Sequence, residues 1–278
     1  MKNTKQIVVV ALVVLLVGAL LAQPISSLVN VKEEASSTAG TEASSVISLD
    51  EISQSAKQGL DANIIQEIAD LEAKISKASD GDKVALYQQL AQKWDDVAKS
   101  APQALIYEEM AKISPKFEYW LKAGKAYRAA YTNLQDTTLA MELNKSAIRA
   151  FEEATKLDGS SLDAKTGLGA AMVTGTNNPM SGIAILREVI AKEPKNLEAN
   201  KTLGLFSLQS RQFDKAVERF KTVVELKPDA ESYFYLATGY ENIGMKSDAI
   251  AAFQKSKELA SDPSLSQFID KRIEELSK

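Results

Sequence analysis

The sequence predicts an all-α protein in which helical hairpins follow one another along the chain. Small and large side chains recur in register, at a period near 34 residues, from residue 84 to residue 261. One copy of such a spacing would be weak evidence, but its recurrence disfavours an ordinary helical bundle with coincidental spacing. The second observation is an uninterrupted apolar run from Ile7 to Ala22, which predicts a segment that meets a membrane ahead of the hairpins.

The composition favours a folded binding protein over an enzyme. The chain has 278 residues, of which 45% are hydrophobic, so it can bury a substantial core. A formal net charge of -4 and the lack of any run of five basic residues disfavour nucleic acid as a partner. Cysteine and histidine are both absent, which removes the usual nucleophiles, acid–base groups and ligands of hydrolases and transition-metal enzymes. We therefore predict no catalytic residue, no cofactor and no metal site.

The apolar run is long for a cleaved signal peptide and short for a stable membrane span. It contains 16 residues, follows Lys2 and Lys5, and is continued by weakly apolar sequence. Cleaved signals have apolar regions of about 7–15 residues, whereas spans need roughly 17–25. A cut after Ala22 would also place the bulky Leu20 where a small residue is required. We therefore favour a retained signal anchor, a single transmembrane helix within residues 1–31.

The charges that flank this run predict its orientation. Lys2, Lys5 and the amino terminus outweigh Lys32 on the other side. Because cytoplasmic flanks carry the excess of positive charge, the N-terminus is predicted in the cytoplasm and the rest of the chain outside it. In a bacterium this describes a single-pass inner-membrane protein with its hairpins in the periplasm. The alternative is a soluble periplasmic protein released by signal cleavage, with a mature chain that starts near Gln23.

A linker and an amphipathic helix are expected between the anchor and the hairpins. Residues 32–48 are rich in Ser, Thr, Ala, Gly and Glu, which predicts a flexible linker. Residues 49–79 then predict one amphipathic helix, whose apolar stripe consists of Ile64, Ile68, Leu71, Ile75 and Ala78. Two heptads are too few to establish a coiled coil, so we favour packing against the following helices. Self-association through the Ile64–Ala78 stripe is the alternative.

The hairpins occupy residues 80–278, and their copies of the spacing differ in quality. The last copy is the clearest, with Tyr233, Leu236, Ala237 and Tyr240 followed by Ala249 and Phe253. The copy before it has Leu203, Gly204, Ala216, Phe220 and Pro228, and an earlier one has Trp120, Ala123, Gly124, Tyr127, Ala147 and Phe151. Two degenerate copies begin at Tyr87 and Leu168. The small residues let the two helices of a hairpin approach, and the large ones fill the remaining space.

This pattern resembles the tetratricopeptide repeat, W-x2-L-G-x2-Y followed by A-x3-F and P, over about two-thirds of the chain. The resemblance implies a right-handed α-solenoid of about five helical hairpins, with a concave groove that grips peptides or protein surfaces. It also implies that the first helix of each hairpin lines the groove. In this register the groove residues are Gln88, Gln92, Lys122, Lys125, Arg128, Lys201, Phe234, Thr238 and Glu241.

Three of these residues form a basic triplet on one predicted helix. Lys122, Lys125 and Arg128 recur every three residues, so they drift only slowly around the helix face. The triplet could receive an acidic peptide or a terminal carboxylate. A solvated stripe of charge is the alternative interpretation. Adjacent carboxylates such as Glu108 and Glu109 point about 100° apart on a helix, so we attribute them to solvated faces and not to acid–base chemistry.

The second hairpin and the C-terminus depart from the regular pattern. In the second hairpin, Tyr127 on the first helix and Phe151 on the second helix are 24 residues apart. In the last hairpin, the corresponding residues Tyr240 and Phe253 are 13 residues apart. We expect both helices of the second hairpin to be lengthened by about one and a half turns, with Asp136 or Thr137 as the cap of its second helix.

Residues 264–277 predict a C-terminal capping helix. It would open with a capping box of Ser264 and Gln267. Its inward-facing residues are expected to be Phe268, Ile269, Ile273 and Leu276. The predicted whole is a membrane-anchored scaffold or adaptor of the bacterial cell envelope, which binds a protein or peptide partner during assembly, secretion or complex maturation.

Overall fold

The computed structural model of the chain describes residues 48–132, 134–176 and 178–278. The expected membrane helix and nearly all of the expected linker lie outside these residues. The described residues form thirteen α-helices and no strand. The helices are α2 (Leu49–Ala56), α3 (Ala62–Lys77), α4 (Asp80–Asp96), α5 (Ser100–Ile113), α6 (Phe117–Tyr131), α7 (Thr137–Leu157), α8 (Leu162–Gly175), α9 (Pro179–Lys192), α10 (Leu197–Gln209), α11 (Phe213–Leu226), α12 (Ala230–Asn242), α13 (Lys246–Leu259) and α14 (Pro263–Leu276). None of them is long and apolar enough to cross a membrane.

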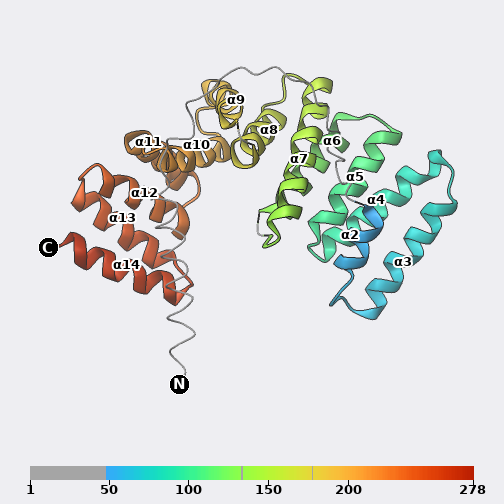
Figure 1. Cartoon of the computed structure of the whole chain (residues 1–278), viewed down its shortest axis with the longest axis horizontal. Coiled ribbons are helices and arrows are strands. Elements are labelled where there is room, and N and C mark those ends of the chain that lie inside the picture. The colour runs from blue at the N-terminus through green and yellow to red at the C-terminus, as the bar shows by residue number, and fades with distance from the viewer. Residues whose placement is uncertain (1–47, 133, 177) are drawn as a thin grey trace, which may run out of the picture. The chain divides into compact units, whose positions relative to one another are not determined.

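The helices pack as five successive hairpins, which Figure 1 shows in chain order. The hairpins pair α4 with α5, α6 with α7, α8 with α9, α10 with α11, and α12 with α13. Among the described helices, the first helices α6, α8, α10 and α12 also touch one another in sequence, whereas the second helices make no comparable contact. The first helices are therefore drawn together on the inner side of the array. This arrangement confirms the expected all-α, tetratricopeptide-like α-solenoid.

The small and large residues of the sequence pattern fit together as predicted. The ring of Phe151 on α7 is 1% exposed and lies between α6 and α8. A Cβ atom would come within 2.8 Å of this ring at Gly124 and within 2.3 Å at Gly167. The same relation holds between Gly204 and Phe220, where the distance would be 2.8 Å. Glycine at these positions allows the close approach of neighbouring helices.

The segment 49–79 forms two helices where one was expected. Between α2 and α3, Gly59 has φ +80°, a left-handed conformation that glycine adopts without a Cβ penalty. The turn folds α2 back toward α3, so that Ser53 Oγ and Lys57 Nζ each lie 2.5 Å from the carboxylate of Glu72. The α3 stripe is turned inward, because Ile68, Leu71 and Ile75 are all buried in a core shared with α4. In the structure this stripe therefore packs against other helices of the same chain.

The second hairpin is lengthened on one side only. Helix α7 has 21 residues, whereas α5, α9, α11 and α13 have 14 each. Asp136 caps it, as predicted, by accepting hydrogen bonds from the amides of Thr138 and Leu139 at 3.0 Å. Helix α6 ends at Tyr131 after 15 residues, against the expectation. The hydroxyl of Thr132 donates to the Arg128 carbonyl at 2.7 Å and satisfies an acceptor at this helix end.

Two details of the last helix also differ from the expectation. Its cap is Asp262, whose carboxylate accepts from the amide of Ser264 at 2.8 Å, so the predicted Ser264 capping box is wrong. Ile269 is fully buried, but Phe268 is 54% exposed and does not face inward. Neighbouring residues on a helix point about 100° apart, so the two side chains cannot share one narrow apolar stripe.

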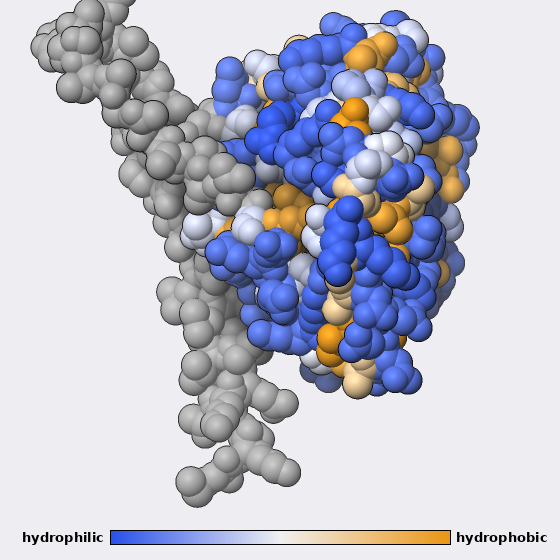
Figure 2. Space-filling model, turned by 90° about the vertical axis from the view of Figure 1, so that its right-hand side faces the viewer, coloured by the Kyte–Doolittle hydropathy of each residue, from blue (hydrophilic) through white to orange (hydrophobic). Residues whose placement is uncertain are grey.

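The surface of the described residues is mainly polar. On the face that Figure 2 turns to the viewer, hydrophilic side chains surround smaller apolar areas. The exposed large apolar side chains are spread over several helices, and the most exposed are Met141 on α7, Met180 on α9 and Phe268 on α14. Single exposed apolar residues are ordinary on protein surfaces.

Candidate functional site

Two adjoining cavities lie along the first helices of the second to fifth hairpins. The first has a volume of about 630 Å³ and is lined from α6, α8 and the start of α10. The second has a volume of about 610 Å³ and is lined from α6, α8, α10 and Glu231 on α12. Both cavities are bordered by Arg128, Thr132 and Glu198. They therefore form one groove with a constriction in the middle, and we call it the first-helix groove.

The walls of this groove combine apolar and polar side chains, and charged side chains cross it. Phe151 and Gly167 border the first cavity but are buried, so the ring that spaces the helices lies beneath the groove surface. Val173, Leu205 and Phe206 line the second cavity. A combination of apolar surface and placed polar groups suits a peptide, because burial of apolar groups supplies affinity and the polar groups fix orientation.

Three ion pairs join one first helix to another along the groove. Lys125 Nζ on α6 lies 2.5 Å from Asp163 Oδ2 on α8. Lys201 Nζ on α10 lies 2.7 Å from Glu231 Oε2 on α12. Each of these pairs connects neighbouring hairpins, so the inner face of the array is held by charge as well as by apolar packing.

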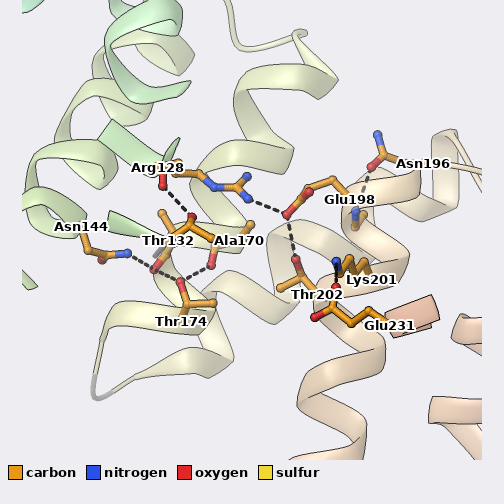
Figure 3. A network of polar contacts seen from close by, with 12 residues as sticks. Arg128, Thr132, Asn144, Ala170, Thr174, Asn196, Glu198, Lys201, Thr202 and Glu231 are labelled. Atoms are coloured by element: carbon orange, nitrogen blue, oxygen red, sulfur yellow. Dashed lines mark hydrogen bonds and ion pairs between the residues drawn. The ribbon is translucent and has the colours of Figure 1, made fainter. Parts of the chain in front are cut away.

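The third ion pair forms the constriction between the two cavities. Arg128 Nη2 on α6 lies 2.6 Å from Glu198 Oε1 on α10, and Figure 3 shows the side chains reaching toward each other. Glu198 also accepts from Thr202 Oγ1 at 3.3 Å. The pair spans residues 70 apart in sequence and passes the intervening hairpin. It is the most shielded of the three pairs, with side chains 25% and 43% exposed.

Of the nine predicted groove residues, the structure brings three together in this groove. These are Lys125, Arg128 and Lys201, and each is already paired with a carboxylate. Lys122 lies apart from the cavities, with its Nζ 5.4 Å from the centre of the Tyr107 ring. The basic triplet is therefore not a stripe of free positive charge.

The other predicted residues lie at the two ends of the array. Gln88 donates to the Tyr119 hydroxyl at 3.4 Å, and Gln92 donates to Asp96 on its own helix at 2.8 Å. At the other end, the Phe234 ring lies 5.9 Å from that of Phe268. The remaining contacts there are Glu241 with Arg272 Nε at 3.0 Å and the Thr238 hydroxyl with the Phe234 carbonyl at 2.9 Å. Neither these five residues nor Lys122 lines the two cavities, and their part in binding stays a prediction.

The prediction missed the acidic half of the groove, although the sequence carries a signal for it. Asp163, Glu198 and Glu231 each occupy the second residue of a first helix, in α8, α10 and α12. Glu118 has the same place in α6. Carboxylates are favoured in the first turn of a helix, where the amide groups leave partial positive charge. An acid that recurs once per repeat at this position could have been found by aligning the hairpins.

One buried polar cluster lies outside the groove and stabilises the second hairpin. Glu108 on α5 was expected on a solvated face, but it is 5% exposed and accepts from the Tyr127 hydroxyl at 2.5 Å. Arg149 Nη2 lies 3.2 Å from both carboxylate oxygens, and Lys112 Nζ lies 3.2 Å from one of them. Burial alone would raise the pKa of Glu108, but the Tyr127 hydrogen bond and the two cations outweigh it and lower the pKa. The cluster joins α5, α6 and α7.

The carboxylates of the described residues form no candidate metal site, and most of those along the groove are paired. No group of three or more aspartate, glutamate, cysteine or histidine side chains within residues 48–132, 134–176 and 178–278 could hold a metal ion. The groove carboxylates Asp163, Glu198 and Glu231 are engaged by cations. What this arrangement can do is recognise a chain that lies along the first helices.

Comparison with known proteins supports the class of fold that the helices define, a tetratricopeptide-like α-solenoid. No protein-family model and no curated protein matches the chain. Among solved structures, it is similar to PilW, a widely conserved type IV pilus biogenesis factor, with 19% identity and a TM-score of 0.55 over 69% of this chain and 85% of PilW.

Two further solved structures are similar over most of their own length. MamA 41-end from Desulfovibrio magneticus RS-1 has 22% identity and a TM-score of 0.51, over 65% of this chain and 97% of MamA. YrrB, a TPR protein with an unusual peptide-binding site, has 18% identity and a TM-score of 0.48, over 72% of this chain and 97% of YrrB. The likeness to PilW and MamA shows the fold that the sequence pattern predicted.

Proposed function

We propose that this protein is a membrane-tethered adaptor that binds a protein or peptide partner in the first-helix groove. The observation that carries the proposal is the pair of adjoining cavities, which follow the inner side of successive hairpins for four first helices. A groove of this form suits an extended chain, because a peptide laid along it would meet an apolar wall and a polar group at each hairpin. A compact small molecule would use only one cavity.

The tether rests on the N-terminal sequence. The apolar run from Ile7 to Ala22 lacks a clean cleavage site, and its positive flank is on the side of Lys2 and Lys5. We place the hairpins on the periplasmic side of a bacterial inner membrane, where the protein would hold partners during assembly, secretion or complex maturation. PilW is a pilus biogenesis factor, and its shared fold is compatible with such a role.

Site-specific photocrosslinking tests the groove. A photoreactive amino acid replaces Thr132, an exposed residue that borders both cavities, in the full chain in native membranes. The matched control replaces Glu152, which is exposed on α7 and lines neither cavity. We expect a discrete crosslinked partner from position 132 and none from position 152. Equal crosslinking from both positions, or crosslinking from position 152 alone, rejects the groove as the binding surface.

The mature N-terminus and a topology reporter test the tether. Intact-mass measurement is expected to find residues 1–22 still attached to the protein in membranes. A reporter that is active only in the periplasm, fused after Lys278, is expected to be active. A mature chain that starts near Gln23, or a reporter active only in the cytoplasm, rejects the proposed tether without affecting the groove.

A further inference from the structure

We propose that the first-helix groove selects a peptide segment that carries a lysine or arginine, with its positive charge placed beside Glu193 in the first cavity. The inference rests on the proposed function, because it requires that the groove takes a peptide. It reverses the sign of the ligand expected from the basic triplet, and it follows from which charges in the groove are already paired.

The cations of the groove are occupied. Lys125, Arg128 and Lys201 each lie within 2.7 Å of a carboxylate on another first helix. An incoming carboxylate would have to displace one of these partners, and for Arg128 it would do so in the most shielded pair. Such an exchange replaces one ion pair by another and leaves the displaced acid facing the ligand, so it gives little net attraction.

Glu193 is the carboxylate in the groove lining that has no cation within ion-pair distance among the described residues. It is exposed and borders the first cavity. Its carboxylate accepts one hydrogen bond, from Asn196 Nδ2 at 2.7 Å. A carboxylate can accept more than one donor, so capacity for a ligand ammonium or guanidinium remains. Asn196 also caps α10 by accepting from the Ala199 amide at 2.9 Å, which fixes the side chain that holds Glu193.

The surroundings of Glu193 add to the attraction for a cation. Glu193 follows the last residue of α9, where the unpaired carbonyl groups give the helix end partial negative charge. The lysines next to it in sequence do not line the cavity, and Lys195 is paired with Glu225 at 3.4 Å. Four carboxylates and three cations line the two cavities together, so the groove carries an excess of negative charge.

The geometry also predicts the spacing of the ligand's side chains. The first cavity offers Ala129 and Leu197 as accessible apolar surface in the same lining as Glu193. A peptide with an apolar residue close to its lysine or arginine can therefore bury the apolar side chain and keep the charged group at the carboxylate. The stem of a lysine or arginine can itself cover apolar surface while its charge stays at the polar edge.

Selection from a random peptide library displayed on phage, against the purified full chain, tests the proposal. The selected peptides are synthesised with a fluorescent label, and their affinities are measured by anisotropy for the wild type, Glu193→Gln and the control Glu152→Gln. We expect enrichment of lysine or arginine next to an apolar residue. Glu193→Gln should weaken binding about fivefold, the effect of an ion pair worth about 1 kcal/mol, and Glu152→Gln should leave it unchanged.

A charge reversal and a crosslink distinguish the outcomes. Glu193→Lys is expected to shift the selection toward acidic peptides, and circular dichroism checks that each variant is folded. Peptides that crosslink to position 132 but are acidic, or whose affinity does not change in Glu193→Gln, overturn the inference and leave the proposed function standing. Peptides that bind without crosslinking at position 132, or a selection that yields none, count against the groove and therefore against the proposed function as well.

Discussion

Phe151 illustrates how single small residues set the geometry of the array. Its ring fills the space between α6 and α8 that Gly124 and Gly167 leave open, and it also borders the first cavity. A methyl group added at either glycine would overlap a ring that is fully packed, and a dense core cannot relax such an overlap without moving a helix. The same residue therefore links helix spacing to the shape of the groove.

Gly167→Ala is expected to destabilise the protein by about 1–3 kcal/mol, because the new Cβ would lie 2.3 Å from the Phe151 ring. The free energy of unfolding measured by urea denaturation checks this value. Gly81→Ala is the matched control, since its nearest atom would be Ser79 Oγ at 3.9 Å. Alanine at position 81 should leave stability unchanged or raise it by up to about 1 kcal/mol. Equal losses in both variants would show that helix spacing is not the cause.

Glu108 makes the stability of the second hairpin depend on pH. Its folded pKa is lowered, so its charged form stabilises the fold above the ordinary glutamate pKa of about 4.3, and this contribution is lost as the pH falls through the folded pKa. Glu108→Gln should lower the free energy of unfolding by about 1–3 kcal/mol at pH 7. The difference from the wild type should shrink below about pH 4.5.

Urea denaturation of both proteins between pH 3.5 and pH 7 measures this difference. Glu153→Gln is the control, because Glu153 pairs with Lys156 at the surface and its loss should change stability by less than about 1 kcal/mol. A Glu108→Gln difference that stays constant over the whole pH range would show that the carboxylate is not the titrating group.

At the scale of elements, α7 shows how a cap decides where a long helix begins. Its extra residues at the start run ahead of the regular hairpin, and Asp136 holds its first turn through two amides. Isolated helix ends fray because their first amides lack partners, so a cap has its largest effect where packing is sparse.

Asp136→Ala is expected to cost about 1 kcal/mol and to act locally. Hydrogen exchange of the amides of Thr138 and Leu139 should become faster, while amides near Phe151 on the same helix keep their protection. Asp136→Ser, which retains a capping oxygen, should exchange nearly like the wild type. Faster exchange along all of α7 would instead indicate that the cap supports the whole helix.

The sequence predicts the regular part of the fold well and its irregular joints poorly. Repeated spacing identifies the hairpins because each copy reports the same packing, as Gly204 and Phe220 do. The break at Gly59 has no such repetition, since a glycine in an amphipathic segment can be helical or left-handed, and the contacts of Ser53 and Lys57 with Glu72 that accompany the turn lie outside any repeated pattern. The inward orientation of Phe268 was predicted wrongly for a related reason. The sequence of one short helix does not determine which of two neighbouring apolar residues, Phe268 or Ile269, faces the core.

The lining of the candidate groove follows from the sequence in part, and its role in binding stays a prediction. The positions of Lys125, Arg128 and Lys201 follow from the register of the first helices. Their carboxylate partners lie on other hairpins. The curvature of the array determines whether a side chain on one hairpin can reach a partner on another. Curvature results from many small packing angles, and no local pattern encodes it. The sign of the free charge in the groove, at Glu193, could therefore be read only from the structure.

At the scale of the whole array, three ion pairs between first helices connect one hairpin to another. The Arg128–Glu198 pair is unusual among them because it joins α6 to α10 past α8. Repeat proteins gain stability mainly from contacts between neighbouring repeats. An ion pair between the second and fourth hairpins therefore restricts bending of the array, which contacts between neighbours restrict only weakly. Its side chains are partly exposed, so its effect on total stability is expected to be below about 1 kcal/mol.

Arg128→Ala should therefore change the spread of conformations more than the stability. The chain has no cysteine, so Glu152→Cys on α7 and Asp214→Cys on α11 provide two unique sites for spin labels. The distance distribution between the labels, measured by pulsed electron paramagnetic resonance, is expected to broaden in Arg128→Ala, because the hairpins on either side of α8 lose their direct tie.

The exchanged pair, Arg128→Glu with Glu198→Arg, should restore a narrow distribution, since the same two helices are again joined by opposite charges. Lys125→Ala is the control for loss of a neighbouring pair, whose side chains are 53% and 56% exposed. It should broaden the distribution less, because apolar packing between α6 and α8 remains. An unchanged distribution in Arg128→Ala would mean that packing alone fixes the curvature, and that the constriction of the groove is free to open when a peptide enters.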